Sequence, residues 1–387
     1  MSTAGSIRSR EYDFGKHTRH YLTLELNGFK TKEEIKNNYR ELYGYLKKKN
    51  IKIVFEKVFG SLSFKNSITG IREYLAETMK LELGPLSYIE GNPVYDVPVS
   101  SVAIYGISMN PEPVHFDYIY DNNNKIGTFY SLSGIEYLYL CGLKCCDNSQ
   151  KATIEEYRSL FRQVQGYMNE RNFLPDSIVR TWIYLDNIYE NYSNFNSARR
   201  EFFANNNVDY SGKSNVLPAS TCIGGRSSQS STAVIDFFCI GKNGDCPKID
   251  RMYNRFQNEA EGKEYRFAPT FARAKSIEYE NYCEVQISGT ASINESGDTV
   301  FVDDPYNQIK KTFLNVKALL EQKDMDFGDV CVSTCFFKKK EYYFIFKEVL
   351  NELKICEPFS TLVISDVCRS DLLFEFDGIA LKRKTPV

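Results

Sequence analysis

The chain has 387 residues, enough for two or three modules of about 100–150 residues each. Its apolar fraction of 42% can form a hydrophobic core, and its formal net charge of −2 argues against nucleic acid as a partner. No apolar run approaches the roughly 18–20 residues that a membrane span needs, and the N-terminal stretch has no signal-peptide core. We therefore expect a cytoplasmic protein that binds neither nucleic acid nor a membrane.

The front of the chain predicts the following alternation: strand 21–29, helix 30–49, strand 51–60, helix 68–83 and strand 99–108. The middle predicts strands 128–134 and 135–143, helix 152–173, strand 178–185, helix 197–207 and strand 233–240. The last third predicts strands 282–292 and 298–304, helix 305–322, strand 330–337, helix 341–353 and strands 361–368 and 372–381.

This last order is ββαβαββ, and the middle third repeats it. The front third is a weaker third copy, although any α+β chain alternates in a similar way. The expected fold is therefore α+β, with tandem modules whose sheets carry helices on one face. We place the modules at 1–110, 111–245 and 246–387. Three copies would pack as an intramolecular pseudo-trimer, whereas a two-copy chain would form a homo-oligomer.

Cysteine and histidine usage limits the chemistry. The chain has 11 cysteines, an odd number at irregular spacing, and this pattern favours reduced core thiols over a disulfide framework. Only three histidines are present, His17, His20 and His115, which leaves little for a zinc site or a Ser-His-Asp arrangement. We expect neither a metal nor a cofactor.

Glu375 and Arg369 are charged residues in the apolar C-terminal stretch 367–382. An unpaired buried carboxylate costs several kcal/mol or becomes protonated. Glu375 is thus either half of a structural ion pair or a general acid whose pKa is raised by an apolar pocket.

Three arginines accompany two stretches of small residues: a loop at 217–225, and a strand end at 288–292 where another group can approach the backbone closely. They are Arg180, Arg199 and Arg273. Each alone suits an ordinary surface ion pair, while together they suit a ligand with two carboxylates, because guanidinium groups bind carboxylates bidentately.

Several motifs in order resemble a known family: RTWIYL followed by NFNSARREFF, then PASTCIGG, APTFARA, SGTAS and VCRSDLLFE. The C-terminal third is similar to the RidA/YjgF fold (chorismate-mutase-like modules), and residues 178–382 resemble the chorismatases. Those enzymes hydrolyse chorismate to pyruvate plus a hydroxybenzoate or a dihydroxycyclohexadiene carboxylate.

The resemblance implies site residues by position. Glu375 falls at the catalytic glutamate, and Arg273 and Arg369 fall near the substrate carboxylates. Cys368 falls beside the ring, where members that release 3-hydroxybenzoate carry a cysteine. The other expected substrate contacts are Arg199, Ala291, Tyr184 and Thr221; Ala291 favours diol-forming members, so the two product indicators conflict.

The chain also departs from the family pattern. The loop after SGTAS reads INESGD without the usual histidine, Ile183 replaces an asparagine, and Arg266 is an imperfect substitute for a family arginine. Two alternatives therefore stay open: a non-catalytic RidA-like small-molecule-binding protein, or a RidA-type imine deaminase or hydrolase of another small carboxylate. The deaminases anchor their substrate with an arginine at the position of Phe359.

Overall fold

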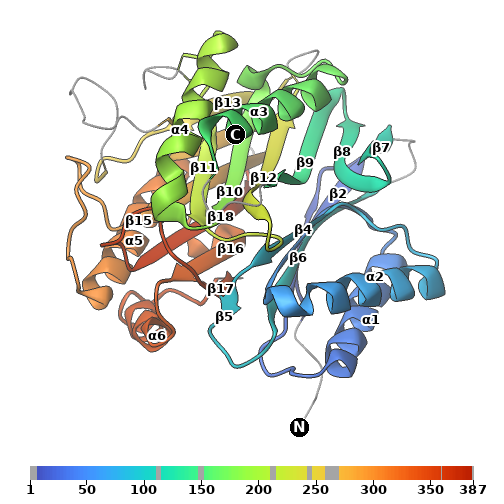
Figure 1. The fold of residues 1–387 in the computed structure, drawn as a ribbon, viewed down its shortest axis with the longest axis horizontal. Coiled ribbons are helices and arrows are strands. Elements are labelled where there is room, and N and C mark those ends of the chain that lie inside the picture. Colours follow the sequence, from blue (N-terminus) through green and yellow to red (C-terminus); the bar gives the residue numbers. More distant parts are fainter. Residues whose placement is uncertain are drawn as a thin grey trace.

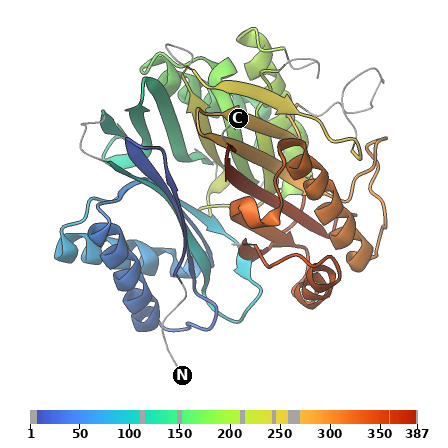
Figure 2. The same cartoon turned by 180° about the vertical axis from the view of Figure 1, so that it is seen from behind.

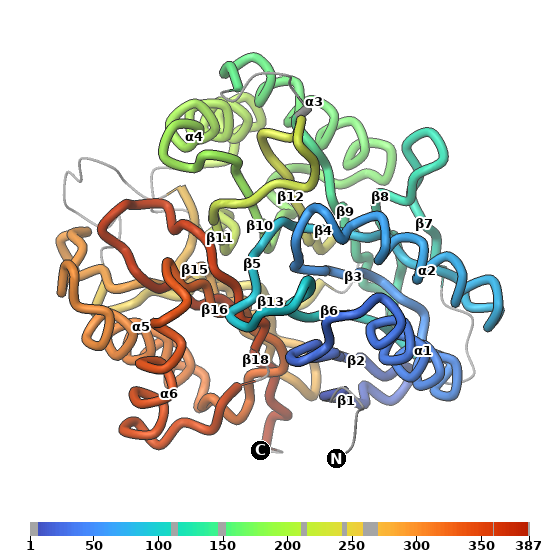
Figure 3. Tube along the Cα trace, turned by 60° about the horizontal axis from the view of Figure 1, so that its bottom comes forward, coloured from blue at the N-terminus to red at the C-terminus, as the bar shows by residue number. Residues whose placement is uncertain are grey.

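The computed structural model describes residues 7–109, 115–146, 152–209, 215–241, 246–257, 270–358 and 360–385. These residues form three β-sheets, and each sheet carries two long helices on one face (Figure 1). Viewed along another direction, the three helix pairs occupy three sides of the molecule and the sheets lie between them (Figure 3).

The first sheet has the order β1-β2-β6-β3-β4. Its helix α1 begins with a capping box, in which Thr31 accepts from the Glu34 backbone and the Glu34 side chain accepts from the Thr31 backbone. The elements are β1 (Ile7–Asp13), β2 (His17–Glu25), α1 (Lys32–Lys48), β3 (Lys52–Gly60), a 3-10 turn (Leu62–Phe64), α2 (Lys65–Met79), β4 (Leu86–Glu90), β5 (Asn92–Pro93) and β6 (Val99–Met109).

The second sheet has the order β11-β10-β12-β9-β8-β7. Thr153 and Glu156 form a second capping box at the start of α3. The elements are β7 (Phe116–Asp121), β8 (Asn124–Leu132), β9 (Ile135–Cys146), α3 (Ile154–Asn169), a 3-10 turn (Pro175–Ser177), β10 (Ile178–Leu185), α4 (Ile188–Asn205), β11 (Ala219–Gly224) and β12 (Ser231–Ile240).

The third sheet has the order β13-β14-β15-β18-β16-β17-β5, so β5 from the front of the chain completes its edge. The elements are β13 (Lys248–Met252), β14 (Ala274–Glu278), β15 (Tyr282–Ala291), α5 (Pro305–Leu320), 3-10 turns (Glu321–Lys323 and Phe327–Asp329), β16 (Val330–Phe337), α6 (Tyr342–Glu352), β17 (Ser360–Ile364) and β18 (Phe374–Arg383).

The three sheets share one core order: β2-β6-β3-β4, β9-β12-β10-β11 and β15-β18-β16-β17. The last two strands of each series are parallel. The prediction of tandem RidA-like modules with helices on one face is therefore confirmed, and the front third is a full copy. The module boundaries at 1–110, 111–245 and 246–387 stay a prediction.

Some predicted elements were wrong. Residues 298–304 do not form a strand, because Phe301 and Asp303 have φ of 59° and 61° and Asp304 caps α5; the hairpin partner of β15 is β14. The loop predicted at 217–225 contains β11, which pairs in parallel with β10. Helix α4 begins at Ile188, earlier than expected.

The inner faces of the three sheets meet in one core of buried side chains, rich in tyrosine. An ion pair at its centre joins all three: Arg19 of β2 lies 2.9 Å from Glu284 of β15 and donates to the hydroxyl of Tyr137 of β9, also at 2.9 Å. The modules thus pack around a common core, and the helix pairs of the first and third modules lie on opposite sides of it (Figure 2). None of the described helices is long and apolar enough to cross a membrane.

Candidate active site

Glu375 lies on β18, with its side chain on the face of the third sheet that points away from the helices. Phe374 and Phe376 pack beneath α5, and because side chains alternate along a strand, Glu375 and Asp377 lie on the opposite face. Glu375 is 4% exposed and pairs with Ala291 of β15 on one side. The sequence placed both residues in the site, and the structure brings them together.

Gly289 makes room for the Glu375 carboxyl. A Cβ added to this glycine would lie 1.9 Å from Oε1 of Glu375 and 3.3 Å from Cγ2 of Thr221. The register of β15 against β18 shifts between Ile287 and Thr290, so Gly289 sits in an irregular stretch of the strand. The carboxyl therefore lies directly over the backbone of β15.

The surroundings of Glu375 favour its protonated form. Burial raises its pKa to about 8, with a further contribution from the negative charge of Asp377, while Arg180 and Arg273 act in the opposite direction. No hydrogen bond or ion pair holds the Glu375 carboxyl within the part of the chain that the structure describes. Arg369, the alternative ion-pair partner, instead donates to the carbonyl of Gly297 at 2.7 Å.

Asp377, Arg180 and Thr221 form a buried polar network beside Glu375. Nη2 of Arg180 lies 3.1 Å from Oδ2 of Asp377, and the Thr221 hydroxyl donates to the same oxygen at 2.8 Å. Thr221 also accepts from Arg180 at 2.5 Å. The hydroxyl of Thr221, which we expected to bind substrate, is thus engaged within the protein, and its methyl group faces Gly289.

Arg180 has unused hydrogen-bonding capacity in this interior. Its side chain is fully buried, yet Nε and Nη1 find no hydrogen-bond partner among the described residues. Burial lowers the pKa of this guanidinium, while Asp377 opposes that effect. The guanidinium also lies 5.0 Å from the ring centre of Trp182, the only tryptophan in the sequence.

A second cluster lies on the opposite face of β11, where the middle and third modules meet. The antiparallel bridge between Ile223 and Val367 places Cys222 opposite Cys368. Burial and the nearby Glu375 raise the pKa of the Cys368 thiol to about 12. Arg199 interacts electrostatically with Cys222 and Cys368. Its guanidinium donates to the Asn196 side chain at 2.7 Å and to the Thr270 hydroxyl.

Of the remaining residues predicted for the site, the structure places one near Glu375 and another away from it. Arg273 is buried immediately before β14 and lies close enough to lower the pKa of Glu375. Tyr184 does not join the cluster, because its hydroxyl accepts from Lys57 of β3 at 2.9 Å. Arg266 and Phe359 lie outside the described residues.

The interface between the first and middle modules contains an equivalent network. Lys57 lies 3.0 Å from Asp236 of β12, and Ser87 of β4 also donates to Asp236. By strand pairing Asp236 corresponds to Asp377, so Val234, two residues earlier, corresponds to Glu375. At the remaining interface Ser101 holds the position of Asp377 and hydrogen-bonds Thr361 at 2.6 Å, and Val99 lies two residues before it. Of the positions Glu375, Val234 and Val99, only Glu375 carries a carboxyl.

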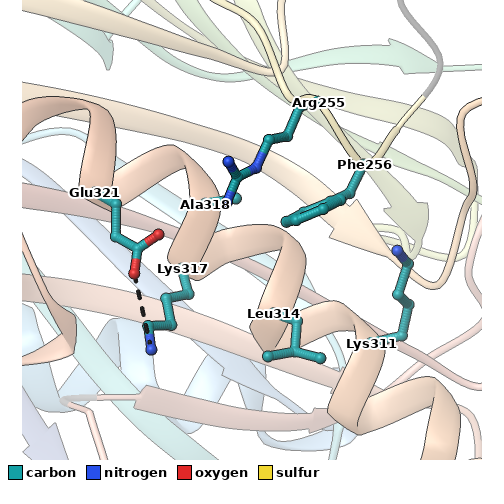
Figure 4. Close-up of a pocket in the computed structure, with 7 residues that line it drawn as sticks. All are labelled: Arg255, Phe256, Lys311, Leu314, Lys317, Ala318 and Glu321. Carbon is teal, nitrogen blue, oxygen red and sulfur yellow. Dashed lines mark ion pairs between the residues drawn. The ribbon is translucent and has the colours of Figure 1, made fainter.

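Two cavities among the described residues lie away from Glu375. One, of about 310 Å³, opens beside α5 and is lined by Arg255, Phe256, Lys311, Leu314, Lys317, Ala318 and Glu321 (Figure 4). The other, of about 630 Å³, lies beside β13 and includes Asp250, Arg251 and Lys323. Neither contains a predicted site residue. The described residues also hold no group of three His, Cys, Asp or Glu side chains suited to a metal ion.

Asp377 was missed in the sequence, and Gly289 was noted only as part of the small-residue strand end 288–292. The period of two in FEFDG was the available signal for Asp377, because it places both acids on one face of the strand. Gly289 needs the register of β15 against β18, which one sequence does not give. Arg180 was noted as a candidate, but its contact with Asp377 crosses from one module to another.

Comparison with known proteins agrees with this architecture. The sequence model of the Endoribonuclease L-PSP family matches residues 275–382. A crystal structure of chorismatase superposes with a TM-score of 0.60 and 14% identity, covering 97% of this chain and 98% of that one.

Shorter structures match about a third of the chain. Yeast Mmf1 has a TM-score of 0.29 and 15% identity over 35% of this chain and 99% of its own. E. coli TdcF with bound serine has a TM-score of 0.26 and 18% identity over 36% of this chain and 99% of its own. No curated protein sequence matches significantly. The match to chorismatase shows that the chain has the same fold along nearly its whole length, and residues 275–382 resemble the L-PSP family.

Proposed function

We propose that the protein is a chorismatase-like enzyme that releases pyruvate from chorismate, with Glu375 as its general acid. The observation that carries this proposal is a buried glutamic acid with a pKa of about 8, at one of three related module interfaces. A carboxyl with a pKa near neutral pH suits proton donation under physiological conditions.

In the proposed reaction, Glu375 donates its proton to the methylene carbon of the enolpyruvyl ether. The C=C electron pair forms the new C–H bond and leaves an oxocarbenium ion at the ether carbon. Water or a ring hydroxyl then adds to that carbon, and the adduct collapses to pyruvate and the ring product. A proton released in this addition restores the acid form of Glu375.

Three buried arginines support a substrate with two carboxylates. Arg180, Arg273 and Arg199 lie around the same interface, and the first two act electrostatically on Glu375 itself. Guanidinium groups bind carboxylates bidentately, and fixing both carboxylates of chorismate would orient its ether toward the acid. Cys368 and Ala291 lie beside Glu375 and are proposed to border the ring. Such positioned acids contribute about 10²–10⁴-fold to a rate.

A second candidate is a catalytically silent small-molecule-binding protein. It is favoured by the loop after β15, INESGD, which lacks the histidine that chorismatases carry there. This candidate would bind aromatic carboxylic acids in a saturable way without turning over chorismate.

The test is a coupled assay of pyruvate release from chorismate by the purified chain and by Glu375→Gln. The matched control is Glu348→Gln, which neutralises an exposed carboxyl on α6 of the same module. We expect release by the native chain and by the control, and a loss of at least about 10²-fold in Glu375→Gln. Undiminished release by Glu375→Gln would refute the mechanism, and saturable binding without release would support the silent protein.

A further inference from the structure

Besides Glu375, Asp377 is the other buried acidic residue of β18. The two residues are two positions apart on β18, so their side chains share a face and their Cα atoms are about 6.5–7 Å apart. Both are almost completely buried, at 3% and 4% exposure. Screening by water between the two carboxyls is therefore weak.

Two buried donors hold the side chain of Asp377 in place. It accepts a hydrogen bond from the Arg180 guanidinium at 3.1 Å and from the Thr221 hydroxyl at 2.8 Å. Hydrogen bonds to an ionised acceptor are stronger than neutral ones. Because Arg180 and Thr221 are themselves buried on neighbouring strands of the middle sheet, the geometry is fixed by the interface.

We propose that Asp377 is the positioning residue of this site: held by Arg180 and Thr221, it keeps the neighbouring Glu375 in its acid form. The role of Asp377 rests on the proposed function of Glu375. The arginines that would bind a dianionic substrate also favour ionisation of Glu375, which would remove the proton that it has to donate. Asp377 compensates Arg180 and opposes that ionisation.

The charged and titratable groups that interact electrostatically with Glu375 come from several elements. They are Asp377 on β18, Arg180 on β10, Arg273 before β14, Cys222 on β11 and Cys368 before β18. Burial raises the pKa of both thiols, so both are neutral near neutral pH. Asp377 is thus the group among them whose negative charge opposes the two arginines.

The related network at the other interface supplies a matched control. Asp236 contacts the cation of Lys57 and accepts from the Ser87 hydroxyl, much as Asp377 contacts Arg180 and accepts from Thr221. The position two residues before Asp236 is Val234, so no acid there depends on this charge. If both aspartates had only a structural role, Asp236→Asn and Asp377→Asn would change stability and would leave the titration midpoint of Glu375 unchanged.

The experiment is a pH titration of the Glu375 carboxyl by carbon-13 NMR, with glutamate labelled at its side-chain carboxyl. The resonance is assigned by its loss in Glu375→Gln. We expect its titration midpoint to fall by at least about one pH unit in Asp377→Asn and to stay unchanged in Asp236→Asn. An unchanged or raised midpoint in folded Asp377→Asn would overturn the proposal.

Asp377→Asn leaves the buried Arg180 charge without its partner and could unfold the chain. The double variant Arg180→Met with Asp377→Asn removes both charges. We expect the midpoint in this double variant to lie below that in Arg180→Met alone, which keeps the Asp377 charge, and equal midpoints would overturn the proposal. The titration needs no turnover, so it gives its answer even if chorismate proves not to be the substrate.

Discussion

The glycine beneath the proposed acid offers the sharpest test of the site geometry. In Gly289→Ala, the new Cβ would lie 1.9 Å from Oε1 of Glu375 and 2.9 Å from its Cδ. Ordinary contacts between such atoms are about 3.5 Å, so the carboxyl must move by roughly 1.5 Å. The methyl group of Thr221, at 3.3 Å from the same Cβ, limits the available space.

The displaced group is the end of a flexible side chain, so we expect a modest loss of folding stability, about 1–3 kcal/mol. Misplacing a catalytic group by about 1 Å costs on the order of 10²-fold in rate. Gly289→Ala should therefore lose about 10²-fold in kcat for pyruvate release while remaining folded, as measured by the coupled assay together with urea unfolding.

The matched control is Gly166→Ala on α3, where an added Cβ meets no atom within 4 Å. It should gain up to about 1 kcal/mol from better helix propensity and keep its activity. In the Glu375→Gln background, Gly289→Ala should cause no further loss of rate. Native kcat in Gly289→Ala would refute the placement of the acid over this glycine.

The other predictions concern charge. Because the folded pKa of Glu375, about 8, lies above the unfolded value, its contribution to stability is full at low pH and is lost as pH rises toward 8. Glu375→Gln should thus have a higher unfolding free energy than the native chain, with a difference that grows to about 4–5 kcal/mol near pH 8. Urea unfolding of both proteins at pH 5 and pH 8 measures this difference, and the same difference at both pH values would contradict the raised pKa. Arg273→Met should raise KM for chorismate by about 10²-fold with a smaller change in kcat, whereas a native KM would remove Arg273 from the substrate contacts. Glu284→Gln should cost about 3–5 kcal/mol of unfolding free energy, because it leaves Arg19 buried without its partner, and unchanged stability would show that the central ion pair is dispensable.

Helices and strands with regular apolar spacing were predicted from the sequence, and elements without such spacing were missed. Helices α3 and α5 and strands β10 and β16 were predicted from apolar periodicity that matches their buried faces. Strand β11 was missed because ASTCIG is made of small residues with little strand propensity, and its pairing with β10 decides its conformation. Strand β18 runs over Phe374–Arg383 instead of the predicted 372–381, because its pairing with β15 and β16 sets its ends.

The candidate site was predicted in part, for a physical reason. Glu375 was recognisable because a charge in an apolar strand demands a partner or a raised pKa. Its actual surroundings were not recognisable: Arg369 was the obvious partner in sequence, whereas the structure places Arg180 and Thr221 from the middle module nearby. Contacts between modules depend on how three sheets pack, which the spacing along one chain does not encode.

The central claim is that a protonated Glu375 drives pyruvate release, and the pH dependence of kcat/KM tests it most directly. The account predicts a rate that is constant at lower pH and falls about tenfold per unit above pH about 8, as the acid loses its proton. Asp236→Asn, remote from the acid, should follow the same curve. A rate that rises with pH through this range would instead require an ionised Glu375 and would contradict the mechanism.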